Sequence, residues 1–192
     1  MRTTQSSVID EILQTFAQKG QARYAREEVT QREHALQSAA LAKEEQAAKP
    51  LVCAALLHDL GHMLGDAQIP GRLEDDLHDR HEEKAYQFLS HHFGSAVAEP
   101  VRLHVAAKRY LCTTEPTYKK QLSPTSLKSF HDQGGEMTPE ELLAFEQNPY
   151  YVDALRLRRW DDIAKEPGKE VPSLENYLPL LKACLTNITT DD

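Results

Sequence analysis

Apolar side chains recur at helical spacing through most of the chain, and capping residues, glycines and prolines divide it into segments. Residues 7–19 place apolar side chains three and four positions apart, and Gly20 follows them. We expect Ser7 with Asp10 to form a capping box at the start of this helix. No stretch alternates apolar and polar residues over the length of a strand. The pattern therefore predicts an all-α protein.

Further helices are expected from their own start and stop signals. Thr30, with a glutamate three residues later, predicts a capping box at the start of a helix that runs to about residue 48. Residues 61–78, rich in glycine, proline and acidic residues, are expected to form a loop. Two more helices are expected at residues 80–93 and 95–111, the second with Ser95 as its cap. Short helices and loops are expected over 112–137. The last helices are expected after Thr138, through 154–160 and at 173–185.

The stretch Leu56–His62 places a histidine and an aspartate side by side after a strongly apolar run that Pro50 begins. Burying the polar side chains of His58 and Asp59 is costly unless something pairs with them, and a divalent metal is a usual partner. An imidazole supplies a neutral nitrogen, and a carboxylate can bridge two ions. Gly61 is expected to let the chain leave the helix. The pair therefore predicts a metal site at the end of a buried helix.

Composition limits the classes of function. The chain has 192 residues, of which 40% are hydrophobic and 27% charged, which is typical of one globular domain over residues 1–192. A net charge of -8 without a block of lysine or arginine argues against a nucleic-acid partner. No signal-peptide core and no apolar run of membrane-spanning length are present, so no membrane partner is expected. Three scattered cysteines indicate reduced thiols and a cytoplasmic protein.

Four further residues are candidates to join the His58–Asp59 pair at a metal: His34, His81, His104 and Asp161. Each lies on a different predicted helix, as expected of a metal site in the core of a helical bundle. Two metals could share Asp59, and the mixture of imidazoles and carboxylates suits iron, manganese or zinc. Spacing alone leaves open whether the fold brings these residues together. The first metal would take His34, His58, Asp59 and Asp161, and the second Asp59, His81 and His104.

Three stretches, together with the six candidate ligands, carry a resemblance to a known family: Tyr24–Glu27, His104–Leu111 and Leu155–Asp161. Over residues 20–180 the chain resembles the HD-domain superfamily and its di-iron branch, which includes myo-inositol oxygenase. It is most similar to the phosphonate-cleaving HD-domain oxygenases, the PhnZ and TmpB group. This resemblance implies a single HD-domain helical bundle with a di-metal site in its core. It also implies two iron ions in the mixed-valence Fe(II)/Fe(III) state and O2 as co-substrate.

Two cations accompany the candidate ligands. Lys108 lies one helical turn beyond His104, and Arg158 lies one turn before Asp161. Two cations beside two metal ligands predict an anion pocket that suits a phosphonate, although both could be solvated charges on helix faces. The resemblance implies that Ser126 and Gln133 hold the phosphonate as well.

The resemblance assigns roles to residues near the predicted metals. Tyr24 can occupy an iron position when substrate is absent, and Glu27 faces the amino end of the substrate. We expect His62 to carry a proton and Glu82 to orient a ligand, with a solvated helix start as the alternative for Glu82. Surface positions are expected for His78, His91, His92 and His131.

By resemblance, the reaction is O2-dependent cleavage of the C–P bond of a 1-hydroxy-2-(amino or trimethylammonio)ethylphosphonate, giving phosphate and glycine or glycine betaine. A separate oxygenase would first install the 1-hydroxyl group. The main alternative is a metal-dependent HD-superfamily phosphohydrolase acting on a nucleotide or phosphomonoester with the same ligands. A non-catalytic phosphonate sensor is a third class. The sequence leaves open which substituent the substrate nitrogen carries and the oligomeric state.

Overall fold

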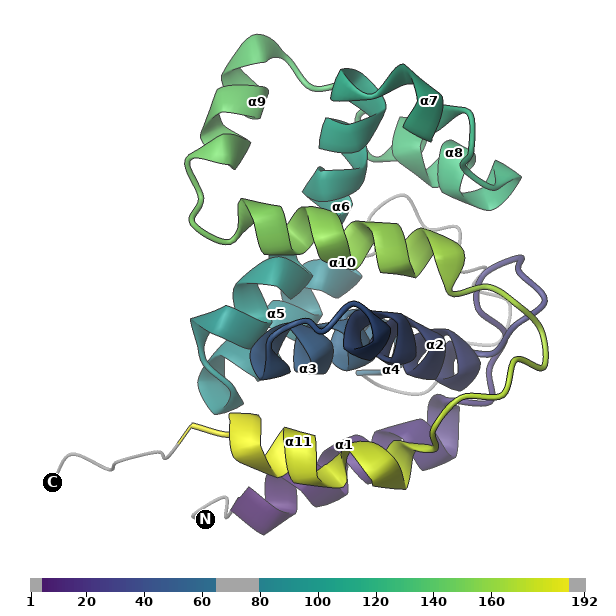
Figure 1. The fold of residues 1–192 in the computed structure, drawn as a ribbon, viewed down its shortest axis with the longest axis vertical. Coiled ribbons are helices and arrows are strands. Elements are labelled where there is room, and N and C mark those ends of the chain that lie inside the picture. Colours follow the sequence, from purple (N-terminus) through teal and green to yellow (C-terminus); the bar gives the residue numbers. More distant parts are fainter. Residues whose placement is uncertain (1–4, 65–79, 187–192) are drawn as a thin grey trace, which may run out of the picture.

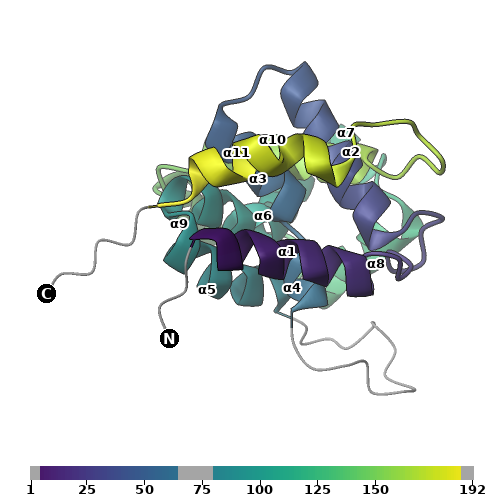
Figure 2. The ribbon, with the colours of Figure 1, turned by 90° about the horizontal axis from the view of Figure 1, so that it is seen from below.

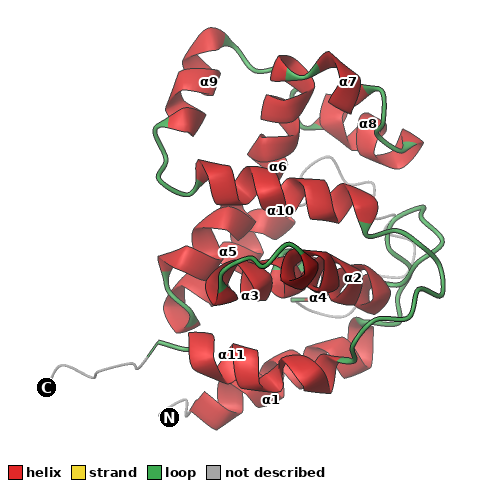
Figure 3. Cartoon of the chain, in the orientation of Figure 1, coloured by secondary structure: helices red, strands yellow, loops and turns green. Residues whose placement is uncertain are grey.

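The computed structural model describes residues 5–64 and 80–186, and this part of the chain is built from helices and the turns that join them (Figures 1 and 3). Its one β-type contact is an isolated bridge between Arg23 and Thr30. The prediction of an all-α protein is confirmed. The α-helices are α1 (Gln5–Lys19), α2 (Gln31–Glu44), α3 (Lys49–Leu57), α4 (Leu60–Met63), α5 (His81–His92), α6 (Ser95–Thr114), α7 (Pro116–Lys119), α8 (Pro124–Asp132), α9 (Pro139–Glu146), α10 (Tyr151–Ile163) and α11 (Leu178–Cys184), and a 3-10 helix, η1, covers Leu174–Tyr177.

Helices α6 and α10 form the centre of the molecule. Helix α10 packs across α6 and also contacts α2 and α3, while α5 lies against α6 (Figure 1). Helices α1 and α11 lie side by side at one end and cover α3 and α4 (Figures 1 and 2). The short helices α7, α8 and α9 lie at the opposite end (Figure 1).

The main hydrophobic core joins residues from α1, α2, α3, α5, α6, α10 and α11. Helix α3 is buried along its whole apolar run from Leu51 to Leu57, as its composition predicts. Trp160 of α10 and Tyr177 of η1 are among the largest fully buried side chains. Burial on all sides of α3 places the end of that helix, where His58 and Asp59 follow, inside the protein.

Two of the capping predictions, at Ser7 and Ser95, differ from the structure. Thr30 forms the predicted capping box with Glu33 at the start of α2. Helix α1 begins at Gln5, so Ser7 is an interior residue of its first turn rather than its cap. The N-cap of α6 is Gly94, with a φ of 74° that favours glycine, and Ser95 is the first residue of the helix. In both cases the residue that carries the hydroxyl belongs to the helix and does not precede it.

Gly61 is needed for a different reason from the one expected. Helix α3 ends at Leu57 with His58 as its C-cap, and Asp59, with φ −100° and ψ 12°, precedes α4, to which Gly61 belongs. A Cβ atom on Gly61 would lie 1.9 Å from the carbonyl oxygen of His81. The glycine therefore permits the close approach of α4 to the start of α5. The expected loop over residues 61–78 begins with α4 instead, and its residues from 65 onward lie outside the described chain.

All three cysteines are free, with Cys53 and Cys112 buried and Cys184 half-buried. None of the described helices is both long and apolar enough to cross a membrane.

Candidate active site

The structure brings the six predicted ligands together in the interior. They come from α2, the junction of α3 and α4, α5, α6 and α10, and all six are buried. Burial of four imidazoles and two carboxylates in one place is costly without compensating partners. The six residues are His34, His58, Asp59, His81, His104 and Asp161.

One part of the cluster, which we call the deep half, contains His34, His58, Asp161 and the Oδ2 atom of Asp59. The Nε2 atoms of His34 and His58 lie 3.1 Å apart. Asp59 Oδ2 lies 3.4 Å from His34 Nε2 and 3.3 Å from His58 Nε2. Asp161 Oδ1 lies 3.3 Å from His34 Nε2 and 3.9 Å from His58 Nε2. Two nitrogens and two carboxylate oxygens thus converge on one point.

The other part, the open half, contains His81, His104 and the Oδ1 atom of Asp59. The Nε2 atoms of His81 and His104 lie 3.2 Å apart, and Asp59 Oδ1 lies 3.4 Å and 3.6 Å from them. The ring of His62 stacks on that of His81 with 3.9 Å between centroids. Each oxygen of Asp59 therefore faces its own pair of imidazoles, as a carboxylate that bridges two ions would.

The Nδ1 atoms fix the direction of the rings. Three of the four imidazoles bring Nδ1 against a backbone carbonyl, which can only accept a hydrogen bond, so Nδ1 carries the proton and Nε2 faces the centre. For His81 the Nδ1 atom lies 3.5 Å from Oε2 of Glu82, the residue expected to orient a ligand. The backbone contacts are His34 with Ala164 at 2.8 Å, His58 with Ala55 at 2.9 Å and His104 with Val101 at 2.6 Å.

Protonation equilibria in the cluster suit metal binding. Burial raises the pKa of Asp59, but His58, His34 and His62 outweigh burial and hold that pKa well below its usual range. Burial lowers the pKa of His104 to about 4, so this imidazole is neutral at pH 7. Burial also lowers the pKa of His34, but Asp161 and Asp59 outweigh it and raise the value to about 9. A divalent cation can take the place of that proton.

Asp59 Oδ2 is buried and accepts no hydrogen bond from any described residue. Such an atom, with two imidazole nitrogens beside it, has room for a stronger partner such as a metal ion. The donor set therefore fits a pair of transition-metal ions.

Tyr24 covers the deep half. Its ring stacks on that of His34 with 3.8 Å between centroids, and its hydroxyl donates a hydrogen bond of 3.3 Å to Asp161 Oδ1. Burial, followed by the charges of Asp161 and Asp59, raises the pKa of Tyr24 well above its usual value. Glu27, in the same turn, accepts a 2.7 Å hydrogen bond from Ser123 Oγ at the start of α8.

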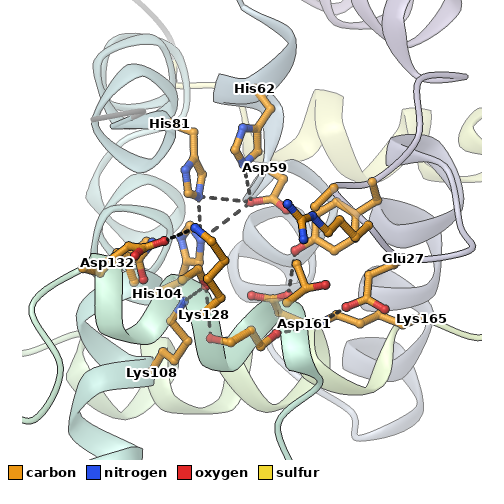
Figure 4. A pocket seen from close by; sticks show the side chains of 18 of the residues that line it. Glu27, Asp59, His62, His81, His104, Lys108, Lys128, Asp132, Asp161 and Lys165 are labelled. Carbon is orange, nitrogen blue, oxygen red and sulfur yellow. Dashed lines mark hydrogen bonds and ion pairs between the residues drawn. The ribbon is translucent and has the colours of Figure 1, made fainter. Parts of the chain in front are cut away.

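A cavity of about 250 Å³ opens onto the cluster (Figure 4). From the open half it is lined by Asp59, His81 and His104, whereas neither His34 nor His58 is among the described residues that line it. His62 also lines it. Figure 4 shows Lys108 and Asp132 on one side of this cavity and Glu27 and Lys165 on the other.

The two predicted cations, Lys108 and Arg158, are buried at this cavity. Lys108 Nζ donates a 2.6 Å hydrogen bond to Ser129 Oγ. Burial, with the nearby charge of Arg158, lowers the pKa of Lys108 to about 7. Arg158 Nη1 lies 2.6 Å from Asp161 Oδ2, and Arg158 Nε donates to Asp162 Oδ2 at 3.1 Å. Arg158 therefore joins the anion pocket to a candidate metal ligand.

The two residues that only the resemblance indicated also line the cavity. Ser126 Oγ accepts a 2.9 Å hydrogen bond from Lys165 Nζ. Gln133 ends α8, and its Oε1 atom is buried without a hydrogen-bond partner in the described part of the chain. All residues expected to hold substrate thus lie around one cavity.

Several residues of this site were not foreseen. Asp162 and Tyr118 fix the position of Arg158. Arg158 Nε donates hydrogen bonds to both side chains, and Tyr118 donates its own hydroxyl proton to the Asp162 carboxylate. The spacing of four residues between Arg158 and Asp162 could have indicated this ion pair. Lys165 and the pair Lys128–Asp132, whose charged atoms lie 2.6 Å apart, also line the cavity. The same four-residue spacing could have indicated the Lys128–Asp132 pair, whereas no sequence pattern marks Lys165.

Among the remaining histidines, His91 and His131 are exposed as expected. His92 is half-buried, because it contacts Phe88 and its backbone oxygen accepts a hydrogen bond from Thr186, so its prediction as a surface residue was wrong. His78 lies outside the described residues.

Comparison with known proteins identifies relatives of nearly the whole chain. Residues 32–145 match the family described as HD domain. Hydroxymethylphosphonate dioxygenase of Gimesia maris is 45% identical over 92% of this chain and 88% of that protein. The glycine-betaine-forming [1-hydroxy-2-(trimethylamino)ethyl]phosphonate dioxygenase of Leisingera caerulea is 35% identical over 94% and 92%. An uncharacterised protein of Acanthamoeba polyphaga mimivirus is 32% identical over 95% and 84%.

Proposed function

The chain belongs to the HD-domain phosphonate oxygenases, and from this membership we propose that it uses O2 to cleave the C–P bond of a 1-hydroxyphosphonate and release phosphate. The observation that supports this reaction best is the Asp59 carboxylate. It faces one imidazole pair with each oxygen, and a cavity lined by cations opens beside it. The assignment to this group, made from sequence motifs, is confirmed.

We propose two iron ions as the resident cofactor, in the mixed-valence Fe(II)/Fe(III) state. The first would be held by the deep half, that is His34, His58, Asp59 and Asp161. The second would be held by the open half, that is Asp59, His81 and His104. The irons supply the redox chemistry with O2, whereas the protein positions the substrate and controls its charge.

The phosphonate group would bind at the cations of the cavity. Arg158 can donate two parallel hydrogen bonds to phosphonate oxygens, and Lys108 adds a second positive charge. Ser126 and Gln133 would complete the contacts, since both line the same cavity. The phosphonate then lies beside the open half, which brings the C1 carbon and its hydroxyl group to the metals.

Tyr24 and Glu27 would respond to the substrate, and His62 would carry a proton. Tyr24 occupies the position over His34 and Asp161 that an entering substrate needs in part, so we expect it to move aside. His62 Nε2 lies 4.0 Å from Asp59 Oδ1, and its side chain is 24% exposed. An imidazole that reaches both the site and solvent can transfer a proton between them.

Two classes of substrate are candidates, and they differ in the substituent at C1. The sequence motifs favour an aminomethyl or trimethylammoniomethyl group, with Glu27 facing the positive nitrogen and glycine or glycine betaine as the product. The second candidate is hydroxymethylphosphonate, the compound named in the relative that is 45% identical. One contact supports this second candidate: Glu27 Oε1 already accepts a hydrogen bond from Ser123, so one of its two oxygens is engaged without a substrate cation.

Further expectations from the sequence remain proposals. We infer a single domain over residues 1–192, supported by a core cluster that joins α1 and α11 to α3. We place the enzyme in the cytoplasm, in keeping with its free cysteines. A separate oxygenase would install the C1 hydroxyl group before this enzyme acts.

The test is O2 uptake measured together with phosphate release by the iron-loaded enzyme. Hydroxymethylphosphonate and the 2-amino and 2-trimethylammonio 1-hydroxyethylphosphonates are compared as substrates. Uptake with one of them, and an electron paramagnetic resonance signal of a coupled Fe(II)/Fe(III) pair, supports the proposal. O2-independent release of phosphate from a phosphomonoester would instead identify a phosphohydrolase. Phosphonate binding without O2 uptake would identify a sensor.

A further inference from the structure

We propose that Lys165 is a third cation of the anion pocket, which binds the phosphonate directly and also orients the Ser126 hydroxyl group. The identity of the anion rests on the proposed function. The existence of an anion site at Lys165 rests on the geometry alone. Lys165 follows the end of α10, outside any helix, and lines the cavity opposite Lys108 (Figure 4).

The ammonium group of Lys165 is nearly buried and has few partners. Its side chain is 11% exposed, and its Nζ atom donates one hydrogen bond, of 2.9 Å, to Ser126 Oγ. The nearest carboxylate oxygens, on Glu27 and Asp162, lie 3.9 Å away, which is too far for a hydrogen bond. Within the described chain, an ammonium with three N–H donors therefore makes a single hydrogen bond. A buried charge in this state favours an acceptor such as a phosphonate oxygen.

The two serines beside the lysines differ in the use of their protons. Ser129 Oγ accepts from Lys108 and donates its own proton to the backbone oxygen of Ser126 at 3.1 Å. Ser126 Oγ accepts from Lys165 and donates to no described residue. Because Lys165 occupies a lone pair of this oxygen, the hydroxyl proton of Ser126 is left to donate into the cavity. Lys165 thus makes Ser126 a donor for an anion.

The main chain on both sides of Lys165 is anchored to α2. The carbonyl of Ala164 accepts a hydrogen bond from His34 Nδ1 at 2.8 Å. The Gln37 side chain makes two hydrogen bonds with the backbone of Glu166, donating at 2.7 Å and accepting at 3.1 Å. Gln37 itself is buried. Lys165 is therefore held in place before substrate arrives, which lowers the entropic cost of using it.

A simpler reading is that Lys165 only balances the charge of Glu27. The 3.9 Å separation permits attraction, and Lys165 also lies 5.8 Å from the centre of the Tyr24 ring. The two readings differ in one respect. If Lys165 only balances Glu27, removal of both charges leaves anion binding unchanged.

The first experiment measures inorganic phosphate binding to the metal-loaded protein by isothermal titration calorimetry. Lys165→Met should weaken binding about tenfold or more, since a charge-assisted hydrogen bond and its charge are lost. Lys165→Arg should retain most of the affinity. The matched control is Lys169→Met, because Lys169 is a more exposed lysine of the same loop that pairs with Glu166. Equal affinity in the Lys165→Met and Lys169→Met proteins would overturn the proposal.

Two double variants separate the readings. Glu27→Gln combined with Lys165→Met should bind phosphate as weakly as Lys165→Met, whereas recovery to the wild-type affinity would show that Lys165 only balances Glu27. In the Ser126→Ala background, Lys165→Met should weaken binding further. No further loss would show that Lys165 does not bind the anion itself. Iron content and melting temperature should match those of the wild type in each protein, and a loss of iron together with phosphate would overturn an anion-binding role.

Failure of this inference is distinguishable from failure of the proposed function. If the wild type consumes no O2 with any hydroxyphosphonate but Lys165→Met still loses phosphate binding, the anion site stands and the oxygenase reaction does not. If O2 uptake is present and Lys165→Met leaves the KM for phosphonate unchanged, the reaction stands and the role of Lys165 is wrong. The expected result is a KM that rises about tenfold or more with a smaller change in kcat.

Discussion

The deep and open halves of the cluster use the same motif in different surroundings. In both, two imidazoles bring their Nε2 atoms to 3.1–3.2 Å of each other and share an Asp59 oxygen. The deep half adds a second carboxylate, Asp161, and is covered by Tyr24. In the open half, Asp59 provides the one carboxylate that faces the Nε2 atoms among the described contacts, and the cavity reaches this half directly.

This difference indicates a division of roles. A metal with four protein ligands is held firmly and has few positions left, whereas one with three ligands keeps positions for substrate. The deep half therefore suits a metal that stays in place, and the open half suits one that changes partners. Asp59 links the two halves, because its Oδ2 atom belongs to the deep half and its Oδ1 atom to the open half.

The strongest test of the comparison removes the shared residue. Asp59→Asn takes a negative charge from both halves, so we expect loss of both metals and of all turnover. Metal content per chain, measured by inductively coupled plasma mass spectrometry, should fall from about two to near zero. Asp153→Asn, in the first turn of α10, is the control and should retain both metals. Retention of one full metal by Asp59→Asn would contradict the bridging role.

The next test separates the halves. His81→Ala and His104→Ala should each release the open-half metal, abolish turnover and leave the deep-half metal bound. The fold should survive, as judged by circular dichroism, because neither residue belongs to the hydrophobic core clusters. His34→Ala should have the opposite selectivity. Full occupancy of both positions in His81→Ala would show that the ligand assignment is wrong.

A smaller effect should follow from a change that reaches only the open half. In Gly61→Ala the new methyl group meets the His81 carbonyl, so the start of α5 must shift. We expect a loss of about 1–3 kcal/mol in the free energy of unfolding and weaker binding of the open-half metal. Gly168→Ala is the control, since its new Cβ meets nothing within 4 Å although its φ is 69°. Unchanged metal affinity in Gly61→Ala would contradict the dependence on this close approach.

The smallest effect concerns pH and the anion pocket beside the open half. Burial and Arg158 lower the pKa of Lys108 to about 7, so Lys108 loses its charge as the pH rises through 7. Phosphate binding should therefore be coupled to the uptake of a proton by Lys108. Between pH 6 and about 8.5, the phosphate affinity of the wild type should fall several-fold more than that of Lys108→Arg, which stays charged. Comparison of the two proteins cancels the titration of phosphate itself. Parallel pH profiles would contradict the assignment.

Much of the fold could be predicted from local signals, since the capping box at Thr30, the apolar run after Pro50 and the cap at Thr138 each mark a helix that exists. The signals failed where the hydroxyl residue lies within the helix and does not precede it, as at Ser7 and Ser95. Gly61 was misinterpreted because glycine serves both turns and close approaches, and only the position of His81 distinguishes the two.

The site was predictable where its chemistry lies in side chains adjacent in sequence. The His58–Asp59 pair indicated a metal without any fold. The anchors that point the imidazoles inward were not predictable, because they are backbone carbonyls of Ala55, Val101 and Ala164, and every residue has a carbonyl. Lys165 was missed for a similar reason, since its importance comes from contacts with segments far away in the sequence.

The hydrogen bond between His34 and Ala164 has a consequence for the synthesis of the protein. It joins groups 130 residues apart, so one of the longest loops of the chain must close before it forms. On the ribosome, α2 and α3 emerge long before Ala164, and the His34 ring has no fixed orientation until then. The metal centre is therefore completed only when nearly the whole chain has been made, and a truncated product that lacks the end of α10 would have the His58–Asp59 pair without a finished site.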